Sequence, residues 1–150
     1  MAYTKTVWED LPSTNTPLSA DNLNKIENEL ELLDGGYIEE SGSNANGNYI
    51  KYSDGTMICT KKVTGTANIT EQYYGSFYHT PDGQYFDLGD YAQEFIDIPV
   101  LNVTFYGANA QWIGAIQDVD KLHIGKLHLL APTSKTAGAY YNVIAIGKWR

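Results

Sequence analysis

The chain has 150 residues, which is enough for one ordinary domain with a hydrophobic core. Twelve tyrosines and fourteen glycines favour strands and turns over a helical bundle. The formal net charge of −8 argues against nucleic acid and anionic membrane surfaces as partners, and no apolar run reaches the length of a membrane span.

Residues 1–17 are predicted to form an extended N-terminal arm, because Ser, Thr, Asn and Pro dominate and little apolar surface is available for burial. The arm carries one apolar cluster, Val7, Trp8 and Leu11. A tryptophan on such an arm is either a local plug against the following helix or an anchor for a partner. The beginning of the sequence has no apolar signal core, so we do not expect export by that route.

Residues 18–36 are predicted to form a helix of about 16 residues, roughly 24 Å long. A stripe of only two heptads is not stable alone in water, so the helix must pack on its own domain, on copies of itself or on a larger assembly. Leu in the first core position with Ile or Leu in the second disfavours a simple two-stranded coil. Together with the family resemblance given below, the stripe predicts a trimeric helical bundle or coiled coil. Acidic residues in the flanking positions would repel between copies, so the helix needs help from other contacts. The stripe predicted to mediate oligomerisation consists of Leu23, Ile26, Leu30 and Leu33.

Residues 37–48 are polar and glycine-rich, which predicts a linker. The next stretch predicts a β-hairpin, because Asp54-Gly55 is a strong two-residue turn signal between two alternating runs. A two-residue turn would place Tyr52 opposite Met57 and Ile50 opposite Cys59 on one face, with Lys51 opposite Ile58 and Tyr49 opposite Thr60 on the other.

Residues 49–150 are predicted to form a C-terminal β-domain. Short alternating runs separated by Gly, Asp or Pro are typical of an antiparallel β-sandwich or barrel. Further strands are predicted within residues 98–107, 111–117, 121–132 and 139–149, and Pro81-Asp82-Gly83 predicts a turn. In the last strand Val143 and Ala145 alternate with Ile144 and Ile146, so both faces are apolar, as in a strand that is covered on both sides.

No catalytic or metal-binding motif stands out in the sequence. Cys59 is the only cysteine, and its place in an alternating run predicts a small buried side chain. His123 and His128 are five residues apart and would point to opposite faces of a regular strand, so we expect no shared metal. Carboxylates that could serve a glycosidase pair or a calcium site match no loop motif and are better explained as solvated turn residues: Asp87, Asp90, Asp97, Asp118 and Asp120. We expect a protein without enzymatic activity, cofactor or metal.

Aromatic residues are crowded between residues 73 and 91, and they suggest a carbohydrate-binding surface. Tyrosine offers a flat apolar face to a sugar ring and a hydroxyl for polar contacts, at a low entropic cost. We assign Phe77, Phe86 and Phe95 to the core. The residues predicted to bind glycan are Tyr73, Tyr74, Tyr78, His79, Tyr85 and Trp112.

Four segments in this order resemble small bacteriophage tail proteins: WEDLPSTNTPLSADNLNKIE, NGNYIKYSDGTMIC, FIDIPVLNVT and the terminal VIAIGKWR. In those proteins an arm and a short helix join the particle, and a C-terminal β-domain faces the host. Residues 64–94 match no pattern of the family. The paired His-X-His motif that holds iron in many fibre tips does not occur in this sequence, and a long shaft is also missing.

The resemblance implies a homotrimeric, receptor-binding tail or fibre-tip protein that recognises host cell-surface polysaccharide. It implies docking to phage baseplate, tail or head proteins through the N-terminus, assembly in the bacterial host cytoplasm and final location in the virion. One alternative is a purely structural baseplate or head-fibre component that binds no receptor. A second alternative is a depolymerase that cleaves surface polysaccharide.

Overall fold

The computed structural model describes residues 20–34, 36–107 and 110–150, and the side chains of residues 20 and 32–34 are not described. The chain divides into two compact units, residues 1–37 and residues 38–150. The predicted arm, with Val7, Trp8 and Leu11, lies outside the described residues. No helix among the described residues is long and apolar enough to cross a membrane.

The first unit contains the predicted helix, α1, at Ala20–Asp34. Asp21 lies in its first turn, where a negative charge interacts favourably with the helix dipole. Leu23, Ile26 and Leu30 all have exposed side chains, and the side chain of Leu33 is not described. The apolar stripe is therefore available to a partner, and its trimeric packing stays a prediction.

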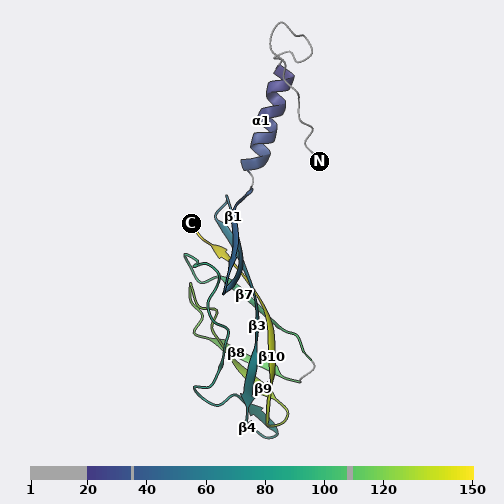
Figure 1. Ribbon diagram of the computed structural model, residues 1–150, viewed down its shortest axis with the longest axis vertical. Coiled ribbons are helices and arrows are strands. Elements are labelled where there is room, and N and C mark those ends of the chain that lie inside the picture. The colour runs from purple at the N-terminus through teal and green to yellow at the C-terminus, as the bar shows by residue number, and fades with distance from the viewer. Residues whose placement is uncertain (1–19, 35, 108–109) are drawn as a thin grey trace. The chain divides into compact units, whose positions relative to one another are not determined.

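The second unit is an antiparallel β-sandwich, as predicted. Its first sheet has the strand order β1-β2-β3-β10-β7 (Figure 1), and we call it sheet A. Two long strands form its centre, and they pair along their whole length from Lys135–Ile69 to Lys148–Thr56. The strands of sheet A are β1 (Ile38–Asn44), β2 (Gly47–Tyr52), β3 (Thr56–Ile69), β7 (Val100–Phe105) and β10 (Lys135–Lys148).

The second sheet, sheet B, is built around β9 (Lys126–Ala131). Both β5 and β6 pair with β9, β4 pairs with β5, and β8 also pairs with β9. These neighbours of β9 are β4 (Glu71–Tyr74), β5 (Phe77–His79), β6 (Phe86–Asp87) and β8 (Trp112–Gln117).

The core lies between the inner faces of the two sheets. Sheet A contributes Met57, Cys59 and Val143, and sheet B contributes Leu127 and Leu129, all of them buried. The segment between β6 and β7 adds further buried side chains, Leu88, Tyr91, Ala92 and Phe95. The buried position of Cys59 confirms the prediction of a small core residue.

The register of the first hairpin differs from the prediction by one residue. Lys51 lies opposite Met57, Ile50 opposite Ile58 and Tyr49 opposite Cys59. The loop holds three residues, 53–55, and Gly55 takes a positive φ of 81° while its N–H donates to the Tyr52 carbonyl at 3.0 Å. A two-residue turn was therefore the wrong choice, and the one-residue slip places the β2 side chains on the opposite face relative to Met57 and Cys59.

The predicted linker at residues 37–48 is also wrong for most of its length. Ile38–Asn44 forms β1, which pairs with β2 through a tight turn at residues 45–46. Asn44 fixes this hairpin on the rest of the domain, because its amide donates to the Ala92 carbonyl at 2.7 Å. Tertiary hydrogen bonding outweighs the low strand propensity of the Ser, Gly and Asn residues here.

The terminal strand, β10, is interior to sheet A, with β3 on one side and β7 on the other. Its inner face is buried at Val143 and Ala145, whereas Ile144 and Ile146 on the outer face are exposed. Within a single chain, the prediction that both faces of this strand are covered is therefore correct for the inner face and wrong for the outer face. The chain end lies beside β1 (Figure 1), where the Trp149 indole donates to the Tyr52 carbonyl at 3.1 Å.

Candidate functional site

The outer face of sheet B gathers aromatic and histidine side chains from four strands and one loop. Alternation along β9 buries Leu127, Leu129 and Ala131 and turns His128 and Leu130 to the outer face. His79 of β5 and Trp112 of β8 both lie opposite Leu130, on its two sides. We use the name aromatic face for Tyr73, Phe77, His79, Tyr85, Trp112 and His128.

Two histidines form the centre of the aromatic face. Nδ1 of His79 lies 2.9 Å from Nε2 of His128, and the rings stand nearly perpendicular at 89° with centroids 5.0 Å apart. His79 is buried, and burial together with His79 lowers the pKa of His128 below its ordinary value. When both rings are neutral, one imidazole can donate to the other across this contact.

Two tyrosines pack on this histidine pair. The Tyr73 ring makes edge contacts with His79 at 5.2 Å and with His128 at 6.4 Å between centroids, yet Tyr73 remains 62% exposed. Tyr85 contacts His128 at 5.5 Å, and its hydroxyl donates to Oδ1 of Asp82 at 2.9 Å. This hydrogen bond raises the pKa of Tyr85. The cluster thus offers an exposed ring, a hydroxyl and a carboxylate within one small area.

A second aromatic pair lies on the same outer face. Phe77 and Trp112 meet edge to face with centroids 6.3 Å apart, and each is 50% exposed. Beside Trp112 in β8, Gly114 lies close to Leu130, since a Cβ at that position would stand 3.1 Å from the Leu130 side chain. Half-exposed rings held by their neighbours suit stacking against an apolar ligand face.

The structure brings together some of the predicted glycan-binding residues and separates others. Tyr73, His79, Tyr85 and Trp112 belong to the aromatic face, although His79 is buried rather than exposed. Tyr74 is highly exposed in β4. Tyr78 alternates with Phe77 and His79 and packs partly against the core, so it lies on the face of β5 opposite to the aromatic face.

Two members of the aromatic face were missed by the sequence reasoning. Phe77 was assigned to the core but is half exposed, whereas Phe95 is buried and Phe86 packs partly against the core as expected. His128 was considered only as a partner of His123. The i, i+2 spacing of Phe77 and His79 was the available signal, because it places the two side chains on one face.

His123 contacts two aspartate side chains. Its Nδ1 lies 3.0 Å from Oδ1 of Asp90, and its Nε2 lies 3.3 Å from Oδ1 of Asp87. Asp120 accepts from the backbone N–H groups of Leu122 and His123, and Asp118 pairs with Lys126 at 3.2 Å. These four aspartates therefore hydrogen-bond to a turn or pair with a basic side chain.

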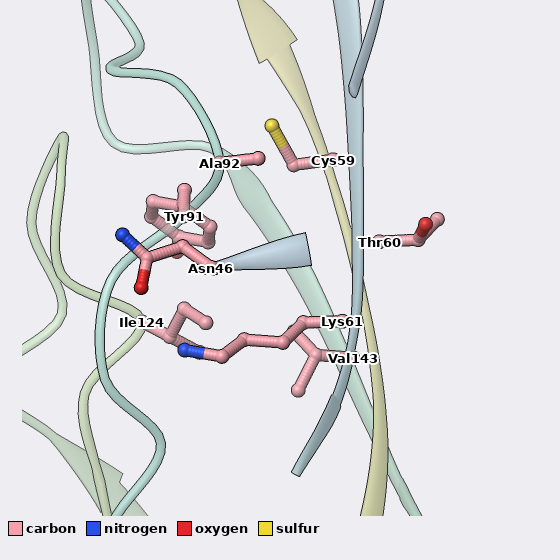
Figure 2. Close-up of a pocket in the computed structure, with 8 residues that line it drawn as sticks. All are labelled: Asn46, Cys59, Thr60, Lys61, Tyr91, Ala92, Ile124 and Val143. Atoms are coloured by element: carbon pink, nitrogen blue, oxygen red, sulfur yellow. The ribbon is translucent and has the colours of Figure 1, made fainter. Parts of the chain in front are cut away.

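A narrow pocket lies on the inner side of sheet A (Figure 2). Cys59 and Lys61 project from β3 toward the segment that carries Tyr91, and Thr60 projects the opposite way. The space is too narrow for a water molecule. Burial raises the pKa of the Cys59 thiol and raises the pKa of Tyr91 to about 12, so both groups stay protonated near neutral pH. The pocket is poorly suited to nucleophilic chemistry, since a thiolate is the reactive form of cysteine.

Among the described residues, no group of three or more His, Cys, Asp and Glu side chains is arranged to hold a metal ion. Comparisons with protein-family profiles, with curated proteins and with solved structures gave no match.

Proposed function

We propose that this chain is a non-enzymatic structural protein of a bacteriophage particle that binds host cell-surface glycan through the aromatic face. The resemblance of the sequence to small phage tail proteins motivates the class of protein. The observation that carries the binding function is the exposure of Tyr73, Phe77 and Trp112 on the outer face of sheet B. Exposed rings in one area mark an interaction surface, and flat rings flanked by hydroxyl and carboxylate groups suit pyranose sugars.

The proposed particle component is a homotrimer that is assembled in the bacterial host cytoplasm and ends up in the virion. The exposed stripe of α1 at Leu23, Ile26 and Leu30 supports assembly through the helix. Val7, Trp8 and Leu11 are proposed to attach the N-terminus to baseplate, tail or head proteins. No nucleic acid or membrane partner is proposed, in line with the net charge of −8.

A glycan array probed with the purified full chain tests the binding function. We expect retention on bacterial surface polysaccharides, with no release of reducing ends on prolonged incubation. Tyr73→Ala and Trp112→Ala should each weaken binding roughly 30-fold, since loss of an aromatic anchor costs about 2 kcal/mol. Tyr106→Ala is the matched control, because Tyr106 is exposed and packs on Tyr140 at the edge of sheet A.

Each alternative gives a different result in the same assay. A purely structural component would bind no glycan on the array at any concentration tested. A depolymerase would release new reducing ends from the glycan that it binds. Binding that survives both the Tyr73 and the Trp112 substitution would move the site away from the aromatic face.

A further inference from the structure

The outer face of sheet A carries an uninterrupted apolar row that crosses four strands. Ile50 of β2 lies opposite Ile58 of β3, Ile58 opposite Ile146 of β10, and Ile146 opposite Val100 of β7. Val100 is 78% exposed and Ile146 is 45% exposed. The outer face of an antiparallel sheet is usually polar, so a row of β-branched apolar residues indicates a surface that is covered in the functional state.

The next row on the same face is uncharged as well. Ile144 lies between Thr60 of β3 and Asn102 of β7, and Asn48 lies on the other side of Thr60. These short amide and hydroxyl side chains can form hydrogen bonds with a partner at little desolvation cost compared with charged groups. The two rows together form a flat patch that combines an apolar strip with a polar uncharged strip.

The patch stands out because the chain as a whole is acidic. The sequence has 18 Asp and Glu residues and a formal net charge of −8. Neither row contains a charged residue, and the nearest charges on the same face along β3 and β10 are cationic, Lys62 and Lys148. Two copies of the chain would repel each other over most of their acidic surfaces but not across this patch.

The lack of charge on the patch indicates which kind of partner can bind to it. A cationic partner would gain nothing from a patch without carboxylates, and an anionic partner would find only two lysines at its ends. A sugar would gain more from the rings of the aromatic face than from isoleucines. Copies of this chain arranged around a threefold axis can each turn the same uncharged apolar row toward that axis.

We infer that the outer face of sheet A is the contact between the β-domains of neighbouring copies in the proposed homotrimer. This inference rests on the trimer of the proposed function and names a second contact for it. The α1 stripe spans only two heptads, whereas a stable interface buries about 800 Å² on each partner. The patch supplies the additional apolar area that such a short helix lacks.

Paired substitutions in the full chain test the contact. Ile58→Thr combined with Ile146→Thr keeps β-branched residues in both strands but replaces the apolar row with hydroxyls. We expect the dissociation constant of the trimer, from sedimentation equilibrium, to rise at least about tenfold. Phe77→Thr combined with Trp112→Thr removes exposed apolar groups from the other sheet and should leave the dissociation constant unchanged.

A crosslinking measurement gives the second readout. In a Cys59→Ala background each chain carries one introduced cysteine, so one bismaleimide can join only two copies. Asn102→Cys should form covalent dimers with a short bismaleimide, and Ser76→Cys in the exposed β4–β5 turn should not. The contact is overturned if the wild type is a trimer, the Ile58→Thr/Ile146→Thr variant keeps the trimer mass, and Asn102→Cys gives no crosslink. If Leu30→Asp still dissociates that trimer, the trimer itself stands and forms through α1. A wild type that is monomeric at all concentrations would overturn the trimer itself.

Discussion

Nδ1 of His79 and Nε2 of His128 face each other at 2.9 Å, although the two residues are 49 positions apart in the chain. A neutral pair shares one proton between these atoms, whereas two imidazolium ions would bring two donors together. The rings of Tyr73 and Tyr85 rest on this pair, so its protonation state affects the aromatic face as well as the stability of the domain.

Acidification is therefore expected to destabilise the domain through His128. Its pKa in the folded protein is lowered from 6.5 by burial and by His79, with Asp82 opposing. As pH falls, the unfolded chain therefore takes up a proton at His128 before the folded protein does. The contribution of His128 to the free energy of unfolding is fully present above pH 6.5 and declines as pH falls toward its lower pKa in the folded protein. The melting temperature measured between pH 7.5 and pH 5 should decrease for this reason.

Substitution separates His128 from the other titrating groups. His128→Gln should flatten the decrease in melting temperature between pH 7.5 and pH 5, and His123→Gln should retain it. Carboxylates titrate mainly below this range and affect both variants alike. Equal pH profiles for His128→Gln and the wild type would show that His128 does not contribute to the pH dependence of stability in this range.

The α1 stripe is expected to hold copies of the chain together. Leu30→Asp places a charge in the exposed apolar stripe and should reduce the mass measured by light scattering from about three chains toward one. Lys25→Asp, at an exposed position that does not belong to the stripe, is the control for added negative charge. If Leu30→Asp keeps the trimer mass, the stripe packs on something other than copies of itself.

The strands of the β-domain could be predicted because their alternation is local. Leu127 and Leu129 face the core while His128 faces outward, as a period of two requires. The register of the first hairpin could not be predicted as reliably, because Asp54-Gly55 fits both a two-residue and a three-residue loop. Met57 and Cys59 share one face in both registers, which differ in whether Tyr49 or Ile50 lies beside them on that face. Tyr49 packs against the core in the structure, and that contact is tertiary.

The candidate site was predicted only in part for a similar reason. The density of aromatic residues pointed to the segment that carries Tyr73 and Tyr85, both of which lie on the aromatic face. The contact between His79 and His128 depends on β5 pairing with β9, which no local spacing reveals. The β1 strand was missed because its Ser, Gly and Asn residues have low strand propensity and are held by pairing with β2.

The alternation along β9 gives a prediction for core stability. Leu129 is fully buried, and Leu129→Ala should lower the free energy of unfolding by about 2–5 kcal/mol. Leu130 lies next to it on the outer face, and Leu130→Ala should cost less than about 1.5 kcal/mol. Urea denaturation followed by circular dichroism measures both. Equal losses for the two variants would mean that Leu130 is buried as deeply as Leu129.

Removal of the last seven residues, from Ile144 onward, is expected to unfold the β-domain. The deletion takes away Ala145, which is fully buried, and Trp149, which packs against the core and donates to the Tyr52 carbonyl. It also removes the end of β10 from between β3 and β7, so both strands lose their partner there. Trp149 is only partly buried, so most of the expected loss comes from the pairing of β10 with β3 and β7, and a whole domain is stable by only about 5–15 kcal/mol.

Deletion of residues 1–17 provides the control, since it removes more than twice as many residues. The arm has too little apolar content to join a core, and its loss should leave thermal unfolding of the β-domain nearly unchanged. The C-terminal truncation should be insoluble or rapidly digested by protease, with no cooperative unfolding transition by circular dichroism. A soluble, protease-resistant truncation would contradict the central position of β10, because a sheet that loses part of a middle strand leaves unpaired backbone groups on both neighbours.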